Sequence, residues 1–577
     1  MILRALYDYY KRCDNLPAPG MEEKQIGFIL VISKSGKFIR IEDCRIDKDT
    51  ARTFLVKKSV GRSSAPVANY LYDNSAYVFG YSNKGNGKED LYFETFKTKA
   101  EEIRTIYPDN DDLNALWLFY QQSREQIVEQ IKNDPLREVV EKNLSKKFSF
   151  FTFRIEGDTK IIAQKKEILD LDKEKATGGN ICLITGCYGH SVETTTATAI
   201  AGSQATAKLV SFQVNSGYDS YGKQKGYNAP ISEEAEFAYT TALNAMLAKG
   251  SHNKFLIGNR SFVFWASSNN EASKQAEESI FDILGFSDGD DDPNSKIEKA
   301  RAVFKSLYTG QLKSTLDDKF FILGLAPNAA RIAVCYWSEL PLKEFAKKIL
   351  QHFEDMEIRD TRKEKKPYMG LKDMLSAVTL GGKVSDATPN LPDAIVKSIF
   401  EGLPYPYTLF ASCIRRIRAE SSQKDNNGRS RNACTIARIA ILKAYLNRVK
   451  DNHKKIQPML DKENTNCGYL CGRLFAVLDK IQEDANRINS IRERYMNAAS
   501  STPSSVFATI LNLSSHHSEK LNEGSRVFYE KLKQEIIDKL SADGFPSHLS
   551  LQDQGRFFIG FYHQRQDLFT AKKTIEE

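Results

Sequence analysis

Residues 28–41 are Phe28-Ile29-Leu30-Val31-Ile32-Ser33-Lys34-Ser35-Gly36-Lys37-Phe38-Ile39-Arg40-Ile41, and they predict two strands joined by a turn. The first five residues are an unbroken apolar run, which is typical of a strand buried on both faces. Ser35-Gly36 has the composition of a tight turn. Apolar residues at every second position of 147–155 predict a further strand, and residues 91–106 and 114–136 have helical patterns. We therefore expect residues 1–165, with a short amphipathic helix over 1–13, to form a mixed α/β domain.

The pattern changes twice further along the chain. Residues 166–340 are expected to form a second α/β part with long polar loops, and its predicted strands are 181–184, 209–212, 260–266, 320–325 and 331–337. Beyond residue 340 the apolar spacing becomes helical, with one long helix predicted over 471–496 and another around Phe528 and Ile536. We divide this region into a basic helical part, 341–458, and a C-terminal α-helical bundle, 459–577. The predicted fold class is α+β.

Composition limits the class of protein. The chain has 577 residues, of which 41% are hydrophobic and 27% charged, and no apolar run approaches the 18 residues of a membrane-spanning helix. Charged residues come too early after Met1 for a secretory signal peptide. Nine cysteines are too few for a disulfide framework and favour a reducing compartment. We expect a cytoplasmic, multidomain protein without membrane attachment.

The positive charge is concentrated in one window. Residues 415–450 carry ten basic and two acidic residues, so this window accounts for the whole net charge of +8. Such a concentration indicates either a polyanion-binding site or a solvated helix face whose partners lie elsewhere in the fold. The candidates for contact with a nucleic-acid backbone or another subunit are Arg415, Arg416, Arg418, Arg429, Arg431, Arg438, Lys443 and Arg448.

The near-matches to catalytic motifs in the sequence are incomplete. Gly87-Lys88-Glu89 and Gly382-Lys383-Val384 lack the Ser or Thr that ends a phosphate-binding loop. Cys467 and Cys471 have no second pair at zinc spacing, which favours two structural cysteines. We predict no catalytic residue, no metal and no cofactor, and the sequence favours a binding protein over an enzyme.

Residues 57–74 have the chemistry of a DNA-reading loop. Cations, hydroxyl groups and flexible backbone come together in Lys57, Lys58, Arg62, Ser63 and Ser64. Asn69 and Asn74 follow, and Asn side chains can pair with adenine edges. The alternative is a solvated basic turn in which both asparagines cap turns. Gln204 and Asn228 lie in a similar but less charged window, where turn roles are the favoured alternative.

Several stretches resemble one family, the large subunit of the type I-C CRISPR Cascade surveillance complex. The resemblance begins with Met1-Ile2-Leu3-Arg4-Ala5-Leu6-Tyr7-Asp8-Tyr9-Tyr10 and includes Ala68-Asn69-Tyr70-Leu71-Tyr72-Asp73-Asn74. It continues through residues 209–212, 228–232, 239–244, 323–331 and 472–478 to Gly555-Arg556-Phe557-Phe558-Ile559-Gly560-Phe561-Tyr562-His563-Gln564-Arg565. The stretches occur in the family's order over essentially the whole chain.

The resemblance implies a non-catalytic subunit of an RNA-guided DNA-binding complex. The N-terminal part would recognise the protospacer-adjacent motif in double-stranded DNA, beside the subunit that holds the 5′ handle of the guide RNA. The C-terminal bundle would resemble the small subunit and help to hold the displaced strand of the R-loop. An internal start at Met459 could produce that small subunit separately. A helicase-nuclease recruited in trans would cut the DNA.

The sequence is also compatible with two other functions. The chain could be a nuclease or nucleic-acid-remodelling enzyme with an unrecognised active site, and metal-dependent cleavage by the isolated chain would favour that function. It could also be a purely structural subunit, in which case substitution of Arg62 or Asn74 would leave DNA binding intact.

Overall fold

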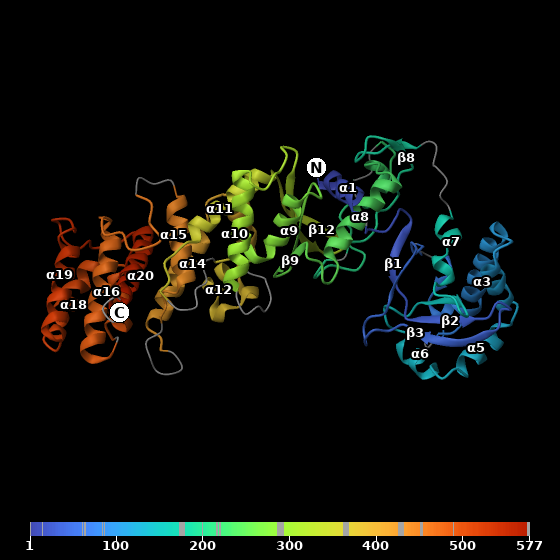
Figure 1. Cartoon of the computed structure of the whole chain (residues 1–577), viewed down its shortest axis with the longest axis horizontal. Coiled ribbons are helices and arrows are strands. Elements are labelled where there is room, and N and C mark those ends of the chain that lie inside the picture. Colours follow the sequence, from blue (N-terminus) through green and yellow to red (C-terminus); the bar gives the residue numbers. More distant parts are fainter. Residues whose placement is uncertain are drawn as a thin grey trace. The chain divides into compact units, whose positions relative to one another are not determined.

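A computed structural model covers the chain (Figure 1) and describes residues 2–13, 15–60, 62, 65–82, 85, 87–171, 179–198, 200–214, 217, 221–284, 293–361, 369–424, 432–449, 454–488 and 490–573. The chain divides into two compact units. The smaller unit comprises Cys13–Thr196 and Ser211–Ala242, and the larger unit comprises Met1–Arg12, Ala197–Val210 and Leu243–Glu577. The four-part division at residues 165, 340 and 458 stays a prediction.

A four-stranded mixed sheet forms the centre of the smaller unit, in the order β3-β2-β6-β5. These strands are β2 (Phe28–Ile32), β3 (Phe38–Asp43), β5 (Tyr72–Asp73) and β6 (Phe151–Ile155). The two strands predicted from residues 28–41 pair antiparallel, while β2 and β6 are parallel. All five β2 residues are buried, as the unbroken apolar run predicts for a central strand. Beside this sheet, β1 (Met21–Gln25) and β4 (Thr53–Lys57) form an antiparallel ribbon.

The longer helices that accompany the sheet are α3 (Glu89–Ile106), α4 (Asp111–Phe119), α5 (Arg124–Lys132) and α6 (Arg137–Asn143). The single helix predicted over 114–136 is wrong, because α4 ends at Phe119 and α5 starts again after Ser123. Ser123 and Gln126 form a capping box there, which satisfies the backbone N–H groups of a new helix start. The rings of Phe119 and Phe153 pack with centroids 5.4 Å apart and tie α4 to the sheet.

The larger unit has an antiparallel sheet in the order β12-β11-β10-β9. Its strands are β9 (Lys254–Ile257), β10 (Arg260–Ala266), β11 (Lys319–Asn328) and β12 (Arg331–Pro341), so the predicted strands near 260, 320 and 331 are confirmed. Helix α1 (Ile2–Arg12) belongs to this unit, because the Tyr9 and Trp265 rings lie 6.4 Å apart and Arg12 donates to the Ala266 carbonyl at 2.7 Å. The strand predicted over 209–212 is wrong. Lys208 makes one isolated bridge to Arg331, and no ladder continues after it.

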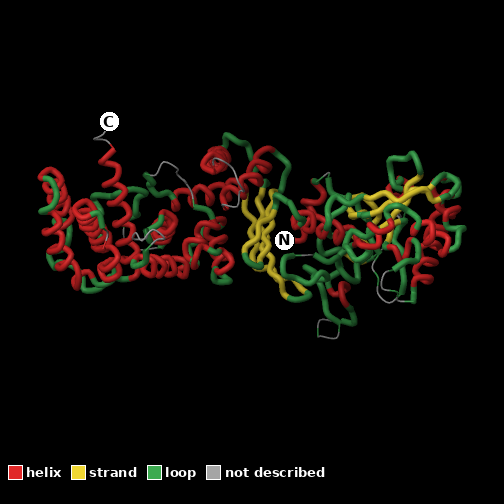
Figure 2. The backbone as a smooth tube through the Cα atoms, turned by 90° about the horizontal axis from the view of Figure 1, so that it is seen from below, coloured by secondary structure: helices red, strands yellow, loops and turns green. Residues whose placement is uncertain are grey.

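Beyond β12 the larger unit is helical, as predicted, and Figure 2 shows the C-terminal part as helices joined by loops. The helices are α9 (Glu271–Leu284), α10 (Pro293–Thr309), α11 (Leu342–Met356), α12 (Leu371–Val378), α13 (Leu391–Phe400), α14 (Tyr407–Ser421), α15 (Ile436–Arg448), α16 (Cys467–Asn486), α17 (Ser490–Ala499), α18 (Pro503–Ser518), α19 (Glu523–Ile537) and α20 (Leu551–Lys573). Two of these helices, α9 and α10, lie between β10 and β11 in the sequence and were not predicted. The single helix predicted over 471–496 is wrong. Helix α16 stops at Asn486, because Arg487 takes a left-handed conformation with φ of 58°.

Glycines let α16 and α20 approach closely. A Cβ atom at Gly472 would lie 2.0 Å from the Phe557 carbonyl oxygen, and one at Gly560 would lie 2.2 Å from the Tyr469 carbonyl oxygen. Buried polar pairs join the same helices, since Arg473 Nε donates to Gln564 at 2.9 Å and Tyr469 Oη lies 3.0 Å from His563 Nδ1. The two stretches at 472–478 and 555–565 that carry the family resemblance therefore form one helix–helix contact.

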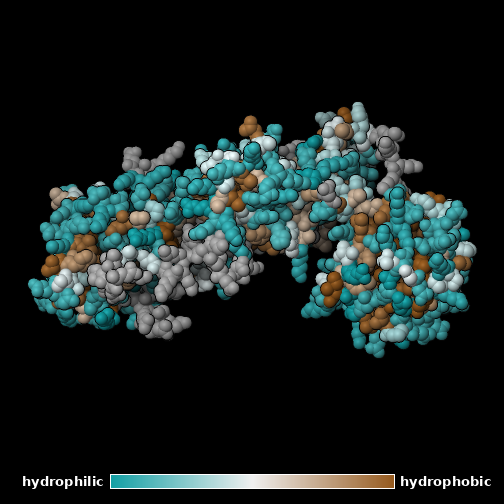
Figure 3. Space-filling view, viewed as in Figure 1, coloured by the Kyte–Doolittle hydropathy of each residue, from teal (hydrophilic) through white to brown (hydrophobic). Residues whose placement is uncertain are grey.

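Mostly hydrophilic residues cover the face of the molecule drawn in Figure 3. No helix in the described parts of the chain is long and apolar enough to cross a membrane.

Candidate nucleic-acid interface

A buried carboxylate organises the loop that follows β4. Asp73, in β5, accepts hydrogen bonds from the backbone N–H groups of Asn69 at 3.0 Å and Asn74 at 2.8 Å, and it forms an ion pair with Arg62. Burial raises the pKa of Asp73, while the Arg62 charge and the N–H donors oppose that rise. These three contacts bring Arg62, Asn69 and Asn74 together around a single charged centre.

Two contacts besides the ion pair hold the Arg62 side chain in place, and part of that side chain remains exposed. Its Nε donates to the Val67 carbonyl at 2.8 Å, and its guanidinium lies 4.1 Å from the centroid of the Tyr77 ring. The side chain is still 30% exposed. Tyr77 was not among the predicted site residues, although its place in the Tyr-rich stretch after Arg62 could have suggested an aromatic partner. Ser63 and Ser64 lie outside the described residues.

Asn69 and Asn74 have structural contacts in this loop. The Oδ1 of Asn69, a buried residue, accepts from the Val60 N–H at 2.9 Å. Asn74 is the N-cap of α2 (Ser75–Val78), and its Oδ1 accepts from the N–H groups of Ala76 at 3.1 Å and Tyr77 at 3.4 Å. The capping alternative that the sequence left open therefore describes Asn74, whereas Asn69 holds a backbone group nine residues earlier in the chain. A role in reading DNA stays a prediction.

The two lysines at the end of β4 differ in their surroundings. Lys57 is buried; its Nζ donates to the Leu171 carbonyl and lies 4.7 Å from the Tyr70 ring centroid. Lys58 is half-buried, and its Nζ donates to Thr196 Oγ1 at 2.8 Å and lies 3.8 Å from the Glu236 carboxylate. Only Lys58 keeps a cation near the surface, so it is the better candidate of the two for a phosphate contact.

Gln204 and Asn228 belong to different units. Gln204 is exposed, and its backbone N–H lies 3.5 Å from the Ala329 carbonyl oxygen. Asn228 is half-buried at the end of a short 3₁₀ helix, Lys225–Asn228, and its Nδ2 donates to the Lys225 carbonyl at 3.0 Å. The Asn228 contact is that of a turn, whereas the Gln204 side chain stays at the surface.

Three cations of the basic window lie inside the larger unit. Arg438 makes a bidentate ion pair with Glu420, and Lys443 Nζ donates to the Glu354 carbonyl at 3.1 Å. Arg448 pairs with Asp355 at 2.6 Å and donates to the carbonyls of Ser398 and Leu403 at 2.7 and 2.6 Å. Burial lowers the pKa of the Lys443 ammonium, so the fold has removed this charge from water.

The remaining predicted cations of the window lie on α14 or outside the described residues. Arg415 is exposed and donates to Ser412 Oγ at 2.9 Å. Arg416 is half-buried and pairs with Glu420, and Arg418 Nη1 lies 3.5 Å from Gln554 Oε1. Arg429 and Arg431 are outside the described residues. Among the predicted cations that the structure describes in this window, Arg415 is therefore the exposed one.

Residues 6–569 match the model of the family described as CRISPR-associated protein (Cas_Csd1). The chain belongs to this family. A comparison with curated proteins finds no match to the chain. Membership in the Cas_Csd1 family confirms the resemblance to the type I-C Cascade large subunit, and the chain is therefore a Cascade subunit that associates with other components of the complex.

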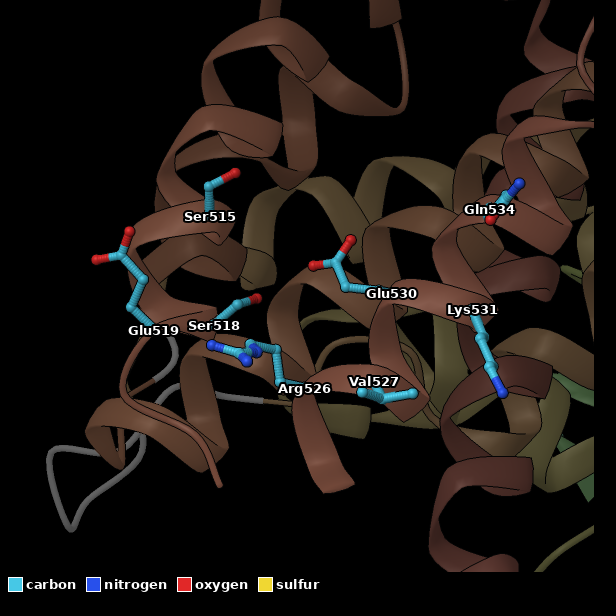
Figure 4. Close-up of a pocket in the computed structure, with 8 residues that line it drawn as sticks. All are labelled: Ser515, Ser518, Glu519, Arg526, Val527, Glu530, Lys531 and Gln534. Atoms are coloured by element: carbon cyan, nitrogen blue, oxygen red, sulfur yellow. The ribbon is translucent and has the colours of Figure 1, made fainter. Parts of the chain in front are cut away.

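This Cas_Csd1 chain also has an open groove between α18 and α19, away from the predicted residues. Its volume is about 350 Å³, and its lining residues are Ser515, Ser518, Glu519, Arg526, Val527, Glu530, Lys531 and Gln534 (Figure 4). The Arg526 side chain extends toward Ser518, whose buried hydroxyl has no hydrogen-bond partner. Two acidic and two basic side chains balance one another, so the groove has no net charge to attract a polyanion.

Nowhere in the part of the chain that the structure describes do three or more His, Cys, Asp or Glu side chains gather into a cluster that could hold a metal ion.

Proposed function

We propose that this Cascade subunit recognises the protospacer-adjacent motif in double-stranded DNA and thereby helps to open the R-loop. Arg62 is the observation that carries the proposal. Its guanidinium is fixed by a buried carboxylate, a carbonyl oxygen and a tyrosine ring, and 30% of the side chain remains exposed. Arginine is the side chain best suited to pair with a guanine edge, and a positioned guanidinium loses little entropy when it binds.

Lys58 complements Arg62 in this proposal. Its half-buried ammonium lies on the same loop, one residue beyond β4, and would contact a DNA phosphate. Phosphate contacts set the position of the duplex and base contacts read its sequence, so the two cations have separate roles. Lys57, Asn69 and Asn74 hold the loop in shape and act on DNA only through it.

The other partners follow from the family. We infer that the chain lies beside the subunit that binds the 5′ handle of the guide RNA, and that the helical region helps to hold the displaced strand. Arg415 is the exposed described cation that we assign to that strand. Cleavage belongs to a helicase-nuclease recruited in trans, and the chain itself has no catalytic role.

The test measures duplex binding by the guide-loaded complex with permuted flanking motifs. Arg62→Ala should abolish the preference for one motif while leaving salt-sensitive, nonspecific binding in place. A lost bidentate base contact corresponds to about 1–3 kcal/mol of discrimination. The matched control is Arg45→Ala, which removes an arginine paired with Asp43 at 2.6 Å in the same unit. The control should bind like the wild type.

Two outcomes would contradict the proposal. Equal weakening for every motif would reduce Arg62 to a phosphate contact, and unchanged discrimination would place motif reading elsewhere in the complex. Cleavage of DNA by the purified chain with Mg²⁺ or Mn²⁺ would contradict the non-catalytic role and favour the nuclease alternative.

A further inference from the structure

Two cysteines flank the turn of a short β-hairpin in the smaller unit. The hairpin consists of β7 (Asn180–Ile181) and β8 (Tyr188–Gly189), which pair antiparallel. Cys182 follows β7 and Cys187 precedes β8, and the Cys182 N–H donates to the Cys187 carbonyl at 2.9 Å. Each cysteine is therefore the first residue beyond the paired strands, and it lies opposite the other. We call Cys182 and Cys187 the hairpin pair.

The backbone between the two cysteines forms a tight turn. Four residues, 183–186, join them, and the Gly186 N–H donates to the Cys182 carbonyl at 2.8 Å. Gly186 has a φ of 76°, which suits glycine. Opposed residues of an antiparallel pair that share backbone hydrogen bonds have Cα atoms about 5.5 Å apart. Disulfides join Cα atoms about 4.4–6.8 Å apart, so this turn has the backbone spacing that a disulfide needs.

Both sulfur atoms of the hairpin pair contact Thr185, which lies in the turn. The Cys187 Sγ donates to the Thr185 carbonyl at 3.9 Å. The Cys182 Sγ accepts hydrogen bonds from the Thr185 side chain and N–H. The two thiols therefore share a neighbour, and Cys187, whose side chain is exposed, can rotate about its Cα–Cβ bond toward Cys182.

The surroundings of Cys182 favour its thiolate form. The residue is 1% exposed, and burial by itself raises the pKa of its thiol. Hydrogen bonds from the side chains and N–H groups of Ser232 and Thr185 outweigh burial and lower this pKa to about 7. At neutral pH about half of the Cys182 side chains are therefore thiolates, and the thiolate is the form that attacks sulfur. Cys182 is the better nucleophile of the hairpin pair, and Cys187 is the more accessible.

Two other cysteine pairs in the described part of the chain differ from the hairpin pair. Cys413 and Cys434 are both buried, and burial raises the pKa of both thiols. Cys467 and Cys471 lie one turn apart on α16, where the hydrogen bond between them and burial raise the pKa of Cys471. Neither pair joins an exposed thiol to a buried thiolate.

We propose that Cys182 and Cys187 form a redox-modification site, which hydrogen peroxide converts to a disulfide. The exposed Cys187 sulfur attacks one peroxide oxygen, the O–O bond breaks, and a sulfenic acid and one water form. The Cys182 thiolate then attacks the Cys187 sulfur, makes the S–S bond and expels hydroxide, which takes up a proton as a second water. Two thiols are oxidised and one peroxide is reduced. A dithiol reductant reverses the change by thiol–disulfide exchange.

A disulfide of this kind agrees with the sparse cysteines of the chain. In a reducing compartment, disulfides are usually transient and often sense oxidants. The hairpin pair would be reduced under ordinary conditions and oxidised when peroxide rises. The proposal is independent of the motif reading assigned to Arg62.

The test is peptide mapping of the full-length chain after exposure to hydrogen peroxide. Free thiols are alkylated in denaturant, and the chain is digested with trypsin and analysed by mass spectrometry. Residues 176–208 form one tryptic peptide, and the hairpin pair are its only cysteines. In the wild type this peptide should carry neither alkyl group and should be two hydrogen atoms lighter. Treatment with dithiothreitol before alkylation should restore both alkyl groups.

Serine variants test the role of each cysteine. Cys187→Ser should slow the peroxide-driven loss of the Cys182 thiol about tenfold or more, because the buried sulfur meets little peroxide. Cys182→Ser should stop the reaction at the Cys187 sulfenic acid, which dimedone traps. Cys467→Ser is the control and should form the hairpin disulfide as the wild type does. If circular dichroism shows that Cys182→Ser is unfolded, Cys187→Ser, at an exposed position, still tests the proposal.

Three results would overturn the proposal. The first is a peptide 176–208 that keeps both alkyl groups after peroxide treatment. The second is a disulfide that joins Cys187 to a different cysteine or to a second copy of the chain. The third is equally fast loss of the Cys182 thiol in Cys187→Ser, which would remove Cys187 from the reaction.

Discussion

Arg438 and Glu420 form a bidentate ion pair that joins α15 to α14, with N–H···O distances of 2.8 and 2.9 Å. Arg438 also donates to the carbonyls of Ala377 and Ala433 at 2.9 and 2.8 Å. Burial opposes ionisation of Glu420, but hydrogen bonds from Arg438 and Arg416 hold the pKa of its carboxyl below the ordinary value. One of the most basic parts of the sequence therefore uses a cation to connect its own helices.

Arg438→Ala should strongly destabilise the chain. The substitution leaves a buried carboxylate with only part of its compensation, which typically costs about 3–5 kcal/mol. Arg415→Ala, an exposed arginine of the same window, should change the free energy of unfolding by less than about 0.5 kcal/mol. Denaturant unfolding followed by circular dichroism measures both. Equal losses would mean that the ion pair contributes no more than a surface contact.

Substitutions of Asn74 distinguish a helix-capping role of its side chain from a DNA-reading role. Asn74→Ala should lower the stability of the chain by about 1 kcal/mol, whereas Asn74→Ser keeps an N-cap acceptor and should lose little. Motif discrimination by the assembled complex should then be the same for wild type and Asn74→Ser. A serine variant that is stable but binds every flanking motif alike would show that the asparagine amide itself reads DNA.

Gly472→Ala should disrupt the contact between α16 and α20. The new methyl group would lie 2.0 Å from the Phe557 carbonyl oxygen, and both backbones would have to move. Overpacking of this kind costs about 1–3 kcal/mol, and backbone clashes cost more. Gly524→Ala in α19 is the control, because its nearest neighbour would be 3.8 Å away and alanine favours a helix by up to about 1 kcal/mol. Similar thermal stability of the two variants would contradict the proposed close packing.

Buried histidines should make the chain sensitive to acid. Burial lowers the pKa of His563 from 6.5 to about 3, and the Lys443 charge adds to that effect. Between those values the unfolded chain binds a proton that the folded chain refuses, so stability falls as the pH falls below about 6.5. The slope reaches about 1.4 kcal/mol per pH unit for one group. His563→Gln should reduce this slope of the unfolding free energy against pH. His548→Gln, at an exposed position, should leave the slope unchanged. The measurement is unfolding free energy at pH 7, 6, 5 and 4; equal slopes in both variants would assign the acid sensitivity to other groups.

Salt dependence tests the assignment of Arg415. If Arg415 contacts the displaced strand, Arg415→Ala should reduce the slope of log K against log [salt] by about 0.7, the value for one single-strand phosphate contact. Arg45→Ala in the smaller unit should leave the slope unchanged. The measurement uses the guide-loaded complex with a pre-opened target duplex at several salt concentrations. An unchanged slope in Arg415→Ala would remove this residue from the nucleic-acid interface.

Local patterns in the sequence predicted much of the secondary structure. The apolar run of β2, the turn at Gly36 and the paired strands β11 and β12 depend on neighbouring residues, so they could be identified without tertiary information. The helix boundaries at Ser123 and Arg487 were missed, because apolar spacing continues across both positions while the backbone changes direction there. The succession of family-like stretches was sufficient to indicate the Cascade large subunit, which the match over 6–569 confirms.

The roles of individual charged residues were decided by tertiary structure. The sequence shows ten cations between residues 415 and 450, but the groups that bind Lys443 and Arg448, the Glu354 carbonyl and the Asp355 carboxylate, come from α11, about 90 residues away. Likewise Arg62 and Asp73 meet only because the loop folds over β5. A side chain is exposed or buried according to what packs against it, and those contacts join segments that sequence spacing does not relate. The sequence by itself therefore determined the family and most of the strands and helices, and only the folded chain decided which cations can face a partner.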